Sequence, residues 1–290
     1  MPRRLETFWL LFPWLATFAL FWLYPLVHSA FLSVTDYHPL TGAAPFVGLR
    51  NYRQLLVDPE FLRALRNTFV FVVGTVPVTT VLALSLALGV NRRLPLRGVF
   101  RAGYFIPTLT ATVVVALLFV HVYAQGGYLH TLARLVGLAD ADRGLLFSEK
   151  TALAAVMVMD IWVSAGYYLL LFLAALQQVP PELYAQAQVN GASSWQTFWY
   201  VTLPLIKPMT LYVVLINTIK SFQIFTEIFV MTQGGPVGAT STVVYFVYHE
   251  GFEKFRMGYA SAAAYVLFFV ILVISVLQAR LFGLARRATD

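Results

Sequence analysis

The sequence predicts an all-α membrane protein, and three observations lead to that fold class. Of its 290 residues, 59% are hydrophobic and only 11% are charged, whereas soluble domains average about 45–50% apolar and about 25% charged residues. Its mean hydropathy is +0.74. Six stretches reach the roughly 20 apolar residues that a membrane-spanning helix requires, and all six are too long to be strands of a membrane barrel.

The predicted spans belong to one membrane domain, which is expected to cover residues 1–290 because no repeat or low-complexity linker interrupts it. In order, the spans cover residues 8–32, 67–90, 103–124, 151–176, 205–231 and 259–282. Arg3 and Arg4 before the first span would also suit a cleaved signal peptide. The apolar run that follows is longer than that of a signal, contains Pro13 and Pro25 and lacks a small-x-small cleavage site, so we expect an uncleaved first span.

The distribution of basic residues predicts that both termini face the cytoplasm, where membrane proteins collect Lys and Arg. In that orientation the cytoplasmic set is Arg3, Arg4, Arg92, Arg93, Arg97, Arg101, Lys207, Arg280, Arg286 and Arg287. The two sides nearly tie in number, ten against nine, so charge density decides: the short connection between the second and third spans holds four arginines and no acid. The longer outer loops hold most of the acids, namely Asp36, Asp58, Glu60, Asp140, Asp142, Glu149, Glu250 and Glu253. The net charge of +7 therefore fits membrane topology rather than nucleic-acid binding.

Several kinds of active site are absent from the sequence. It contains no Cys, which excludes disulfides and thiolate-bound metals, and its five His residues show no metal-ligand spacing. It has no G-x-x-x-x-G-K-[ST] phosphate-binding loop and no nucleophile elbow around a serine. We therefore expect a protein without catalytic residues, bound metal or bound cofactor, whose energy source lies on another chain.

The most informative segment is the polar loop of residues 177–208, which is long for a connection between helices. Two prolines followed by Glu182 indicate the start of a short helix. Gly191 would end that helix in a left-handed conformation, and a second helix is expected over residues 192–201. Such a helix–glycine–helix element suits docking into a groove of a partner protein. The alternative is an elbow that lies on lipid headgroups.

This loop resembles the EAA loop of permease subunits in ATP-binding-cassette importers. The residues that match the family pattern are Pro180, Glu182, Leu183, Tyr184, Ala187, Gly191, Ala192, Ser193, Trp195, Phe198, Leu203 and Pro204. The resemblance implies that the loop forms a coupling helix seated in a cleft of an ATPase subunit. The residues expected to contact that subunit are Glu182, Tyr184, Ala185, Ala187, Asn190, Gly191, Ala192 and Ser193.

Two carboxylates of the family pattern are missing from this loop. Ala185 stands where the family has the acid of its EAA motif, Gln186 replaces the alanine after it, and Asn190 replaces the aspartate before the glycine. Charge-assisted contacts to an arginine of the ATPase would be lost at the two acidic positions. One hypothesis is that this chain is the weaker-coupling half of a heterodimer whose other permease carries the acids.

Two further stretches, residues 46–71 and 221–267, resemble the carbohydrate-uptake branch of the same family. The recurring elements of the second stretch are Thr232, Gly234, Gly235 and Pro236 in a turn, followed by residues 248–252 and 258–262. The resemblance implies the six-helix bundle of a type I importer permease with a cytoplasmic coupling helix. It also implies a cargo that is a sugar or short oligosaccharide, with glycerol phosphate or a polyol as the alternative.

The resemblance further implies the partners and location of the chain. The partners are a second permease subunit, expected to be a different chain, two ATPase subunits that carry ATP and Mg, and an extracytoplasmic binding protein. The binding protein would deliver cargo near residues 124–150 and 234–253. The location is the cytoplasmic (inner) membrane of a bacterium or archaeon.

Polar side chains inside the fourth and fifth spans are candidates for lining a passage, because such groups are costly in lipid and usually face a cavity. By helical spacing, one set shares a face of each span: Asp160, Ser164, Tyr167 and Tyr168 on the fourth, and Asn217, Lys220, Gln223 and Glu227 on the fifth. Carboxylates and amides hydrogen-bond sugar hydroxyls, and aromatic rings pack against sugar C–H groups. Two alternatives are structural ion pairs of Lys220 with Asp160 or Glu227, and an ion relay through these three residues in a carrier that acts alone.

Overall fold

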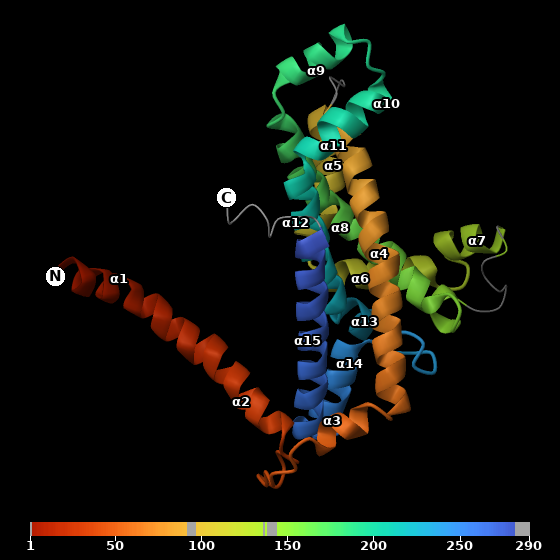
Figure 1. Ribbon diagram of the computed structural model, residues 1–290. Coiled ribbons are helices and arrows are strands. Elements are labelled where there is room, and N and C mark those ends of the chain that lie inside the picture. The colour runs from red at the N-terminus through yellow and green to blue at the C-terminus, as the bar shows by residue number, and fades with distance from the viewer. Residues whose placement is uncertain (1, 92–96, 136, 138–143, 282–290) are drawn as a thin grey trace. The chain divides into compact units, whose positions relative to one another are not determined.

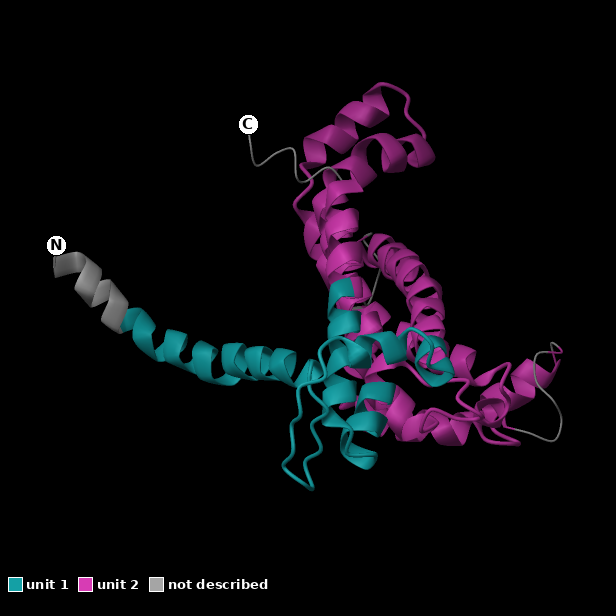
Figure 2. Ribbon diagram, turned by 60° about the horizontal axis from the view of Figure 1, so that its bottom comes forward, with its two compact units in different colours: residues 1–62, 246–269 teal, residues 63–245, 270–290 magenta. Residues whose placement is uncertain are grey.

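The computed structural model describes residues 2–91, 97–135, 137 and 144–281, and its regular structure in these ranges is helical apart from two isolated β-bridges (Figure 1). The all-α class predicted from the sequence is therefore confirmed. The chain forms two compact units (Figure 2), one of residues 1–62 and 246–269 and the other of residues 63–245 and 270–290. The single domain over residues 1–290 stays a prediction.

The helices follow one another in the order labelled in Figure 1. The first half contains α1 (Pro2–Phe18), the π-helical turn η1 (Ala19–Leu23), α2 (Tyr24–Ser33), α3 (Arg50–Leu55), α4 (Pro59–Asn91), α5 (Arg97–Leu109), α6 (Thr112–Tyr123), α7 (Tyr128–Leu135) and the 3₁₀ turn η2 (Leu145–Phe147). The second half contains α8 (Ala152–Gln177), α9 (Pro181–Val189), α10 (Ser194–Thr197), the π-helical turn η3 (Phe198–Thr202), α11 (Leu203–Leu205), α12 (Lys207–Phe222), α13 (Thr226–Met231), α14 (Val243–Tyr248), the π-helical turn η4 (His249–Glu253) and α15 (Met257–Leu281).

Within the described ranges, four continuous helical segments are long and apolar enough to cross a membrane. They are Leu10–Ser33, Pro59–Asn91, Ala152–Gln177 and Met257–Leu281. Two bent pairs bring the number to six if each pair counts as one span. The bends are 98° between Gly98–Leu109 and Thr112–Tyr123, and 69° between Ser194–Leu205 and Lys207–Phe222. The predicted first, second, fourth and sixth spans thus lie on continuous helices, whereas the third and fifth do not.

The predicted third span over residues 103–124 is not one continuous helix, because the helix breaks at Thr110 and Ala111. Pro107 lies one turn before the break and lacks the N–H that would continue the helical ladder. Ala111 has φ −57° and ψ 129°, outside the helical region, and α6 begins anew after it. The sequence shows the proline but not the break. Whether a proline ends a helix or only bends it depends on which group replaces the lost backbone hydrogen bond.

The predicted fifth span over residues 205–231 is not one continuous helix either. Helix α12 ends at Phe222, and α13 begins only at Thr226. The carbonyl oxygen of Ile224, between them, accepts a hydrogen bond from the Thr242 hydroxyl (3.2 Å). Non-helical backbone is tolerated at membrane depth where such partners satisfy it, and local composition does not reveal a partner that comes from another segment.

Helix α4 begins at Pro59, well before the predicted start at residue 67. The Asp58 carboxylate caps it by accepting hydrogen bonds from the backbone N–H groups of Glu60 (2.8 Å) and Phe61 (3.4 Å). The first two turns carry charged residues, which a criterion of apolarity rejects. Apolarity therefore identifies the membrane-spanning part of α4 and not its whole length.

The loop of residues 177–208 contains two short helices, of which the second differs from its prediction. Gly191, after α9, has a φ of +73°, so the predicted left-handed stop is confirmed. The second helix starts at Ser194 and not at residue 192, because Ser193 caps it: the Ser193 hydroxyl accepts from the Gln196 N–H (3.3 Å), and the Gln196 side chain accepts from the Ser193 N–H (2.8 Å). This reciprocal capping box sets the helix start.

In the first unit, side-chain hydrogen bonds tie α3 to the segment that follows α2. The Asn51 amide donates to the carbonyl oxygens of Ser33 and Thr35, both at 2.9 Å, and the Tyr52 hydroxyl donates to the Ser33 hydroxyl (2.8 Å). Gly258 of α15 approaches the Thr35 backbone so closely that any side chain at 258 would overlap it. These contacts order the loop at the end of the first span.

The first unit also contains a buried carboxylate, that of Glu250, which is 1% exposed. It accepts hydrogen bonds from the Lys254 ammonium (2.6 Å) and the Arg256 guanidinium (2.8 Å). Partial burial lowers the pKa of Lys254, but the hydrogen bonds and charges of Glu250 and Glu60 outweigh it and raise that pKa above its ordinary value. Lys254 therefore keeps its charge beside the buried carboxylate, and Arg256 supplies a second hydrogen bond to it.

In the second unit, α8 joins two apolar clusters along its length. The buried members of the first are Phe71, Val115, Ala116, Tyr123, Leu145, Leu146, Ala155, Val156, Met159, Ile224, Ile228 and Met231. Those of the second are Ala83, Ala87, Val90, Tyr168, Leu169, Phe172, Leu173, Leu176, Val179, Ile206 and Val213. The stretch of α8 between the two clusters carries Asp160 and Ser164. Polar residues therefore lie where neither apolar cluster encloses the helix.

Some predicted features lie outside the described residues. They are Arg92, Arg93, Arg286 and Arg287 of the cytoplasmic set, Asp140 and Asp142 of the outer acids, and the end of the sixth span at residue 282. The orientation of the termini therefore stays a prediction.

Candidate functional site

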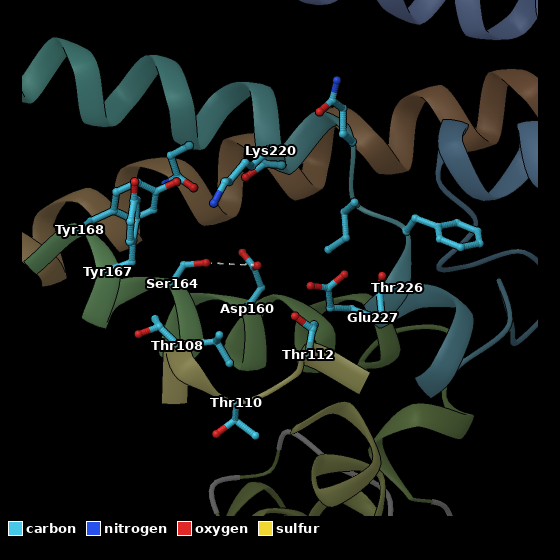
Figure 3. Close-up of a pocket in the computed structure, with 16 residues that line it drawn as sticks. Thr108, Thr110, Thr112, Asp160, Ser164, Tyr167, Tyr168, Lys220, Thr226 and Glu227 are labelled. Carbon is cyan, nitrogen blue, oxygen red and sulfur yellow. Dashed lines mark hydrogen bonds between the residues drawn. The ribbon is translucent and has the colours of Figure 1, made fainter. Parts of the chain in front are cut away.

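A cavity of about 310 Å³ lies in the second unit, where α5 and α12 end and α6 and α13 begin, against the middle of α8 (Figure 3). Its lining residues are Thr108, Thr110, Thr112, Asp160, Val163, Ser164, Tyr167, Tyr168, Asn217, Lys220, Ser221, Gln223, Ile224, Phe225, Thr226 and Glu227. Ser164 lies near the midpoint of the 26-residue helix α8, so the cavity lies about halfway along that span. We call it the polar cavity.

Helix ends converge on the polar cavity because of the two breaks. The first turn of α6 contributes Thr112, the last turn of α12 contributes Lys220, and the first turn of α13 contributes Glu227. An acid at the start of a helix and a base at its end are each stabilised by the partial charges there, which is a structural reason for Glu227 and Lys220. Broken helices whose ends face a cavity at mid-membrane depth also form the binding sites of many transporters.

The acidic and basic side chains that line the cavity, those of Asp160, Glu227 and Lys220, form no ion pair with one another. Figure 3 shows the carboxyl groups of Asp160 and Glu227 and the ammonium group of Lys220 directed into the same space. The Asp160 carboxylate accepts a hydrogen bond from the Ser164 hydroxyl (3.4 Å), whereas the Lys220 ammonium lies 5.0 Å from the centre of the Tyr167 ring. Across the described ranges, no ion pair within 4.0 Å joins Lys220 to either carboxylate. The structural ion pairs weighed from the sequence are therefore not formed in this structure.

Two buried polar groups of the cavity lining lack a hydrogen-bond partner in the described part of the chain. They are the hydroxyl of Tyr168 and the amide nitrogen of Asn217, and the two residues are 1% and 2% exposed. An unsatisfied buried donor costs about 1–3 kcal/mol. Both atoms are themselves buried, so these donors stay unsatisfied behind the surface of the cavity.

The structure brings all eight residues that the sequence assigned to a passage to this one cavity. Glu227 reaches it from α13, and not from the helical face that carries Lys220 as predicted, because the break separates the two helices. Sequence reasoning missed the hydroxyl-bearing residues Thr108, Thr110, Thr112, Ser221 and Thr226. The only sequence signal for the first three is their alternation after Pro107 in an apolar stretch.

The residues expected to contact a partner form one exposed element at one end of α8 and α12 (Figure 1). Glu182, Tyr184, Ala185 and Ala187 lie on α9, and Asn190, Gly191, Ala192 and Ser193 form the turn after it. Helix α9 has no buried residue, and Val189 at its end is 88% exposed. The Tyr184 hydroxyl accepts a hydrogen bond from Thr202 (3.4 Å), which joins α9 to η3. The element is therefore tied to η3 through Tyr184, and most of its residues are exposed.

The loop between α13 and α14 is anchored to α4. The Asn67 amide donates to the carbonyl oxygens of Gly238 and Ser241, both at 3.0 Å, and the Arg63 guanidinium donates to the carbonyl oxygen of Val237 (2.6 Å). In the parts of the chain that the structure describes, no group of three or more His, Cys, Asp or Glu residues is arranged to hold a metal ion.

The chain is similar to known transport proteins over most of its length. The sequence model of the family described as "Binding-protein-dependent transport system inner membrane component" matches residues 75–286. The probable ABC transporter permease protein YurN of Bacillus subtilis (strain 168) is 33% identical over 268 residues, which are 91% of this chain and 92% of that protein. The arabinooligosaccharides transport system permease protein AraP of the same organism is 34% identical over 273 residues, 93% of this chain and 86% of that protein.

A solved structure of similar fold comes from a bacterial ABC transporter involved in the import of the acidic polysaccharide alginate. One of its chains matches with a TM-score of 0.82 and 23% identity, and the match covers 99% of each chain. At that level of identity the likeness shows the fold alone.

Proposed function

This chain belongs to the family of binding-protein-dependent transport system inner membrane components, and we propose that it is a membrane-spanning subunit of an ATP-driven importer for a sugar or short oligosaccharide. It has no phosphate-binding loop of its own. ATP and Mg therefore bind to separate ATPase subunits in this proposal, and the chain itself is not an enzyme.

The observation that carries the proposal is the polar cavity halfway along α8, bounded by two broken helices. The side chains of Tyr167, Lys220 and Gln223 are exposed at its edge, so a single chain leaves it open. We propose that a second permease subunit of different sequence covers this opening. The two chains together would then enclose the translocation pathway, with each chain forming half of it.

The chemistry of the cavity supports a saccharide cargo. Carboxyl groups accept hydrogen bonds from sugar hydroxyls, and tyrosine rings suit sugar C–H faces. A relative named for arabinooligosaccharides supports the same class. Glycerol phosphate or a polyol is the alternative cargo.

The second part of the proposal is that residues 177–208 dock an ATPase subunit from the cytoplasm. The exposed face of α9 suits insertion into a groove, and Glu182 supplies one carboxylate. Ala185 and Asn190 supply none, so docking would rest on shape and on neutral hydrogen bonds at those positions. We infer that the other permease carries the acids and couples more strongly.

The proposed assembly contains this chain, a second permease, two ATPase subunits and an extracytoplasmic binding protein in the cytoplasmic membrane of a bacterium or archaeon, with both termini of this chain in the cytoplasm. The binding protein would approach the outer loops near residues 124–150 and 234–253. The anchoring of the latter loop by Asn67 and Arg63 would present it in a defined shape.

Co-purification tests the assembly. A tag after Asp290 is used to isolate this chain from detergent extracts of cells that express the complete importer, and an ATPase subunit and a second permease are expected to follow it. Gly191→Pro should release the ATPase and retain the second permease, because proline holds φ near about −65° where the native φ is +73°. A folded chain that purifies alone, or a Gly191→Pro variant that retains the ATPase, would contradict the proposal.

Gly42→Pro is the matched control for that experiment. Gly42 also has a positive φ, +66°, and like Gly191 it has open space where a side chain would project. Its loop follows α2 and not α8, so the same kind of backbone strain should leave ATPase binding intact.

An ion-coupled carrier is the alternative function, because Asp160, Lys220 and Glu227 line one cavity. Transport measurements distinguish it from the importer. Uptake into proteoliposomes is measured after ATPase inactivation and after collapse of the proton gradient. The importer loses uptake only with ATPase inactivation. Loss only on collapse of the gradient would favour the carrier instead.

A further inference from the structure

We infer that the polar cavity accepts uncharged saccharides and rejects anionic ones, so that the cargo is a neutral sugar rather than a uronate or a phosphate ester. The inference rests on the proposed function, because it concerns the same cavity. It is carried by the number and placement of the acidic and basic side chains that face the cavity.

The charges of the lining do not favour an anion. Two carboxyl groups, those of Asp160 and Glu227, face a single ammonium group, that of Lys220. The carboxyl groups come from different helices and point into one space, with Thr112 beside them (Figure 3). Among the described lining residues there is no arginine or histidine. An anion in this space would lie near two carboxyl groups and one ammonium group, with no surplus of basic side chains to attract it.

The one ammonium group is also already engaged. It lies over the Tyr167 ring, 5.0 Å from the ring centre, where the electron-rich face attracts a cation. Sites that select carboxylates or phosphates commonly use the planar guanidinium of arginine, which matches two oxygens at once. A lysine ammonium shared with an aromatic ring provides no such match.

A neutral saccharide suits the two carboxyl groups of the cavity better than an anion does. Its hydroxyl groups donate hydrogen bonds to the carboxyl oxygens of Asp160 and Glu227. A carboxylate or phosphate group in its ionised form offers only acceptor oxygens, so it has no proton to donate to these carboxyl groups.

The absence of cysteine makes a direct test of this selectivity possible. Because the chain contains no Cys, Thr112→Cys places its only thiol in the cavity lining. In the assembled importer, modification of this chain by methanethiosulfonates with a positive, zero or negative charge is followed by mass spectrometry. Comparing the reagents at one thiol cancels the pKa and burial of that thiol, and dividing by the rates with free cysteine removes their intrinsic reactivities.

After that correction the rates are expected to fall from the cationic to the uncharged to the anionic reagent, with at least about a tenfold difference between the extremes. Asp160→Asn and Glu227→Gln should each move the ratio toward one, because they keep the shape of the side chain and remove its charge. Glu149→Gln is the matched control: this carboxylate is exposed and does not line the cavity, so its removal should leave the ratio unchanged.

An anionic reagent that reacts as fast as the cationic one, or a ratio that neither variant changes, would overturn the inference and leave the importer proposal standing. One further outcome would overturn both the inference about uncharged cargo and the importer proposal. If none of the three reagents modifies Thr112→Cys with or without ATP, while Thr41→Cys in the exposed loop after α2 reacts, the cavity is not a water-filled pathway. Failure of the importer proposal alone would appear as loss of co-purification, which this assay does not measure.

Discussion

The ammonium nitrogen of Lys220 lies 5.0 Å from the centre of the Tyr167 ring, across the polar cavity from the carboxyl groups of Asp160 and Glu227. A cation over an aromatic face contributes about 0.5–2 kcal/mol, depending on solvation. Tyr167→Leu should therefore lower the free energy of unfolding by about 1 kcal/mol, whereas Tyr167→Phe should change it little because the ring remains. Unfolding of the purified protein in detergent measures both. When Lys220→Met is also present, the free energies of unfolding of the two Tyr167 variants should differ much less. If they differ as much as they do with Lys220 in place, the contact between Lys220 and Tyr167 is refuted.

Gly166 should be intolerant of a side chain because it touches the backbone of α5. A Cβ atom at this position would overlap the carbonyl oxygen of Tyr104, and overpacking typically costs about 1–3 kcal/mol. Gly166→Ala should lower the melting temperature of the purified protein. Gly103→Ala on α5 is the control, since open space surrounds that position, and replacing a helical glycine there should be neutral or stabilising by up to about 1 kcal/mol. Equal destabilisation by both variants would contradict the close approach.

Asn67 should control the order of the loop between α13 and α14. Asn67→Asp keeps the shape of the side chain and removes the amide group that donates to Gly238 and Ser241. Each lost hydrogen bond is worth about 1 kcal/mol, so amide hydrogen exchange in residues 232–242 should become faster by about tenfold or more. Gln54→Glu is the control, because Gln54 is exposed on α3. Unchanged exchange in Asn67→Asp would show that other contacts hold the loop.

The two bases around Glu250 should act non-additively on stability. Removing Arg256 alone, as Arg256→Met, leaves the Lys254 hydrogen bond to the buried carboxylate, and the loss should be small. Removing both bases leaves a buried charge without a partner, which costs about 3–5 kcal/mol. Adding Glu250→Met to the double variant should restore most of that stability, because the buried charge is then absent. Additive losses in denaturant unfolding, or no rescue by Glu250→Met, would contradict this account.

The missing acid at Ala185 makes a prediction about coupling. Ala185→Glu should increase ATP hydrolysis stimulated by the cargo-loaded binding protein, since a charge-assisted hydrogen bond contributes about 1.5–3 kcal/mol. Gln188→Glu adds the same charge elsewhere on the same exposed helix and should not increase it. A rate of hydrolysis that Ala185→Glu leaves unchanged would argue against the hypothesis that this chain is the weaker-coupling half.

The site residues could be predicted to different extents for a chemical reason. Asp160, Lys220 and Glu227 stand out because a charge in a span must face a polar space or a partner. Threonine gives no such signal, since its hydroxyl can donate to a carbonyl oxygen in the preceding turn of its own helix. Thr108 and Thr110 do so with Phe105 and Ile106, and this leaves their position at the cavity unmarked in the sequence.

Composition and local pattern alone determined the helical class, four helices long and apolar enough to cross a membrane, and the left-handed stop at Gly191. These properties follow from residues that are adjacent in the chain, through apolar content over one span length and through backbone freedom at one position. Only the tertiary structure decided where the other two spans break, and that Glu250, an acid of an outer loop by sequence, is buried against two bases. The break near Ile224 depends on Thr242, and the cavity depends on four helix ends meeting at the middle of α8. Such features require partners from distant segments, because a backbone group or a charge removed from water is tolerated only where another group compensates it.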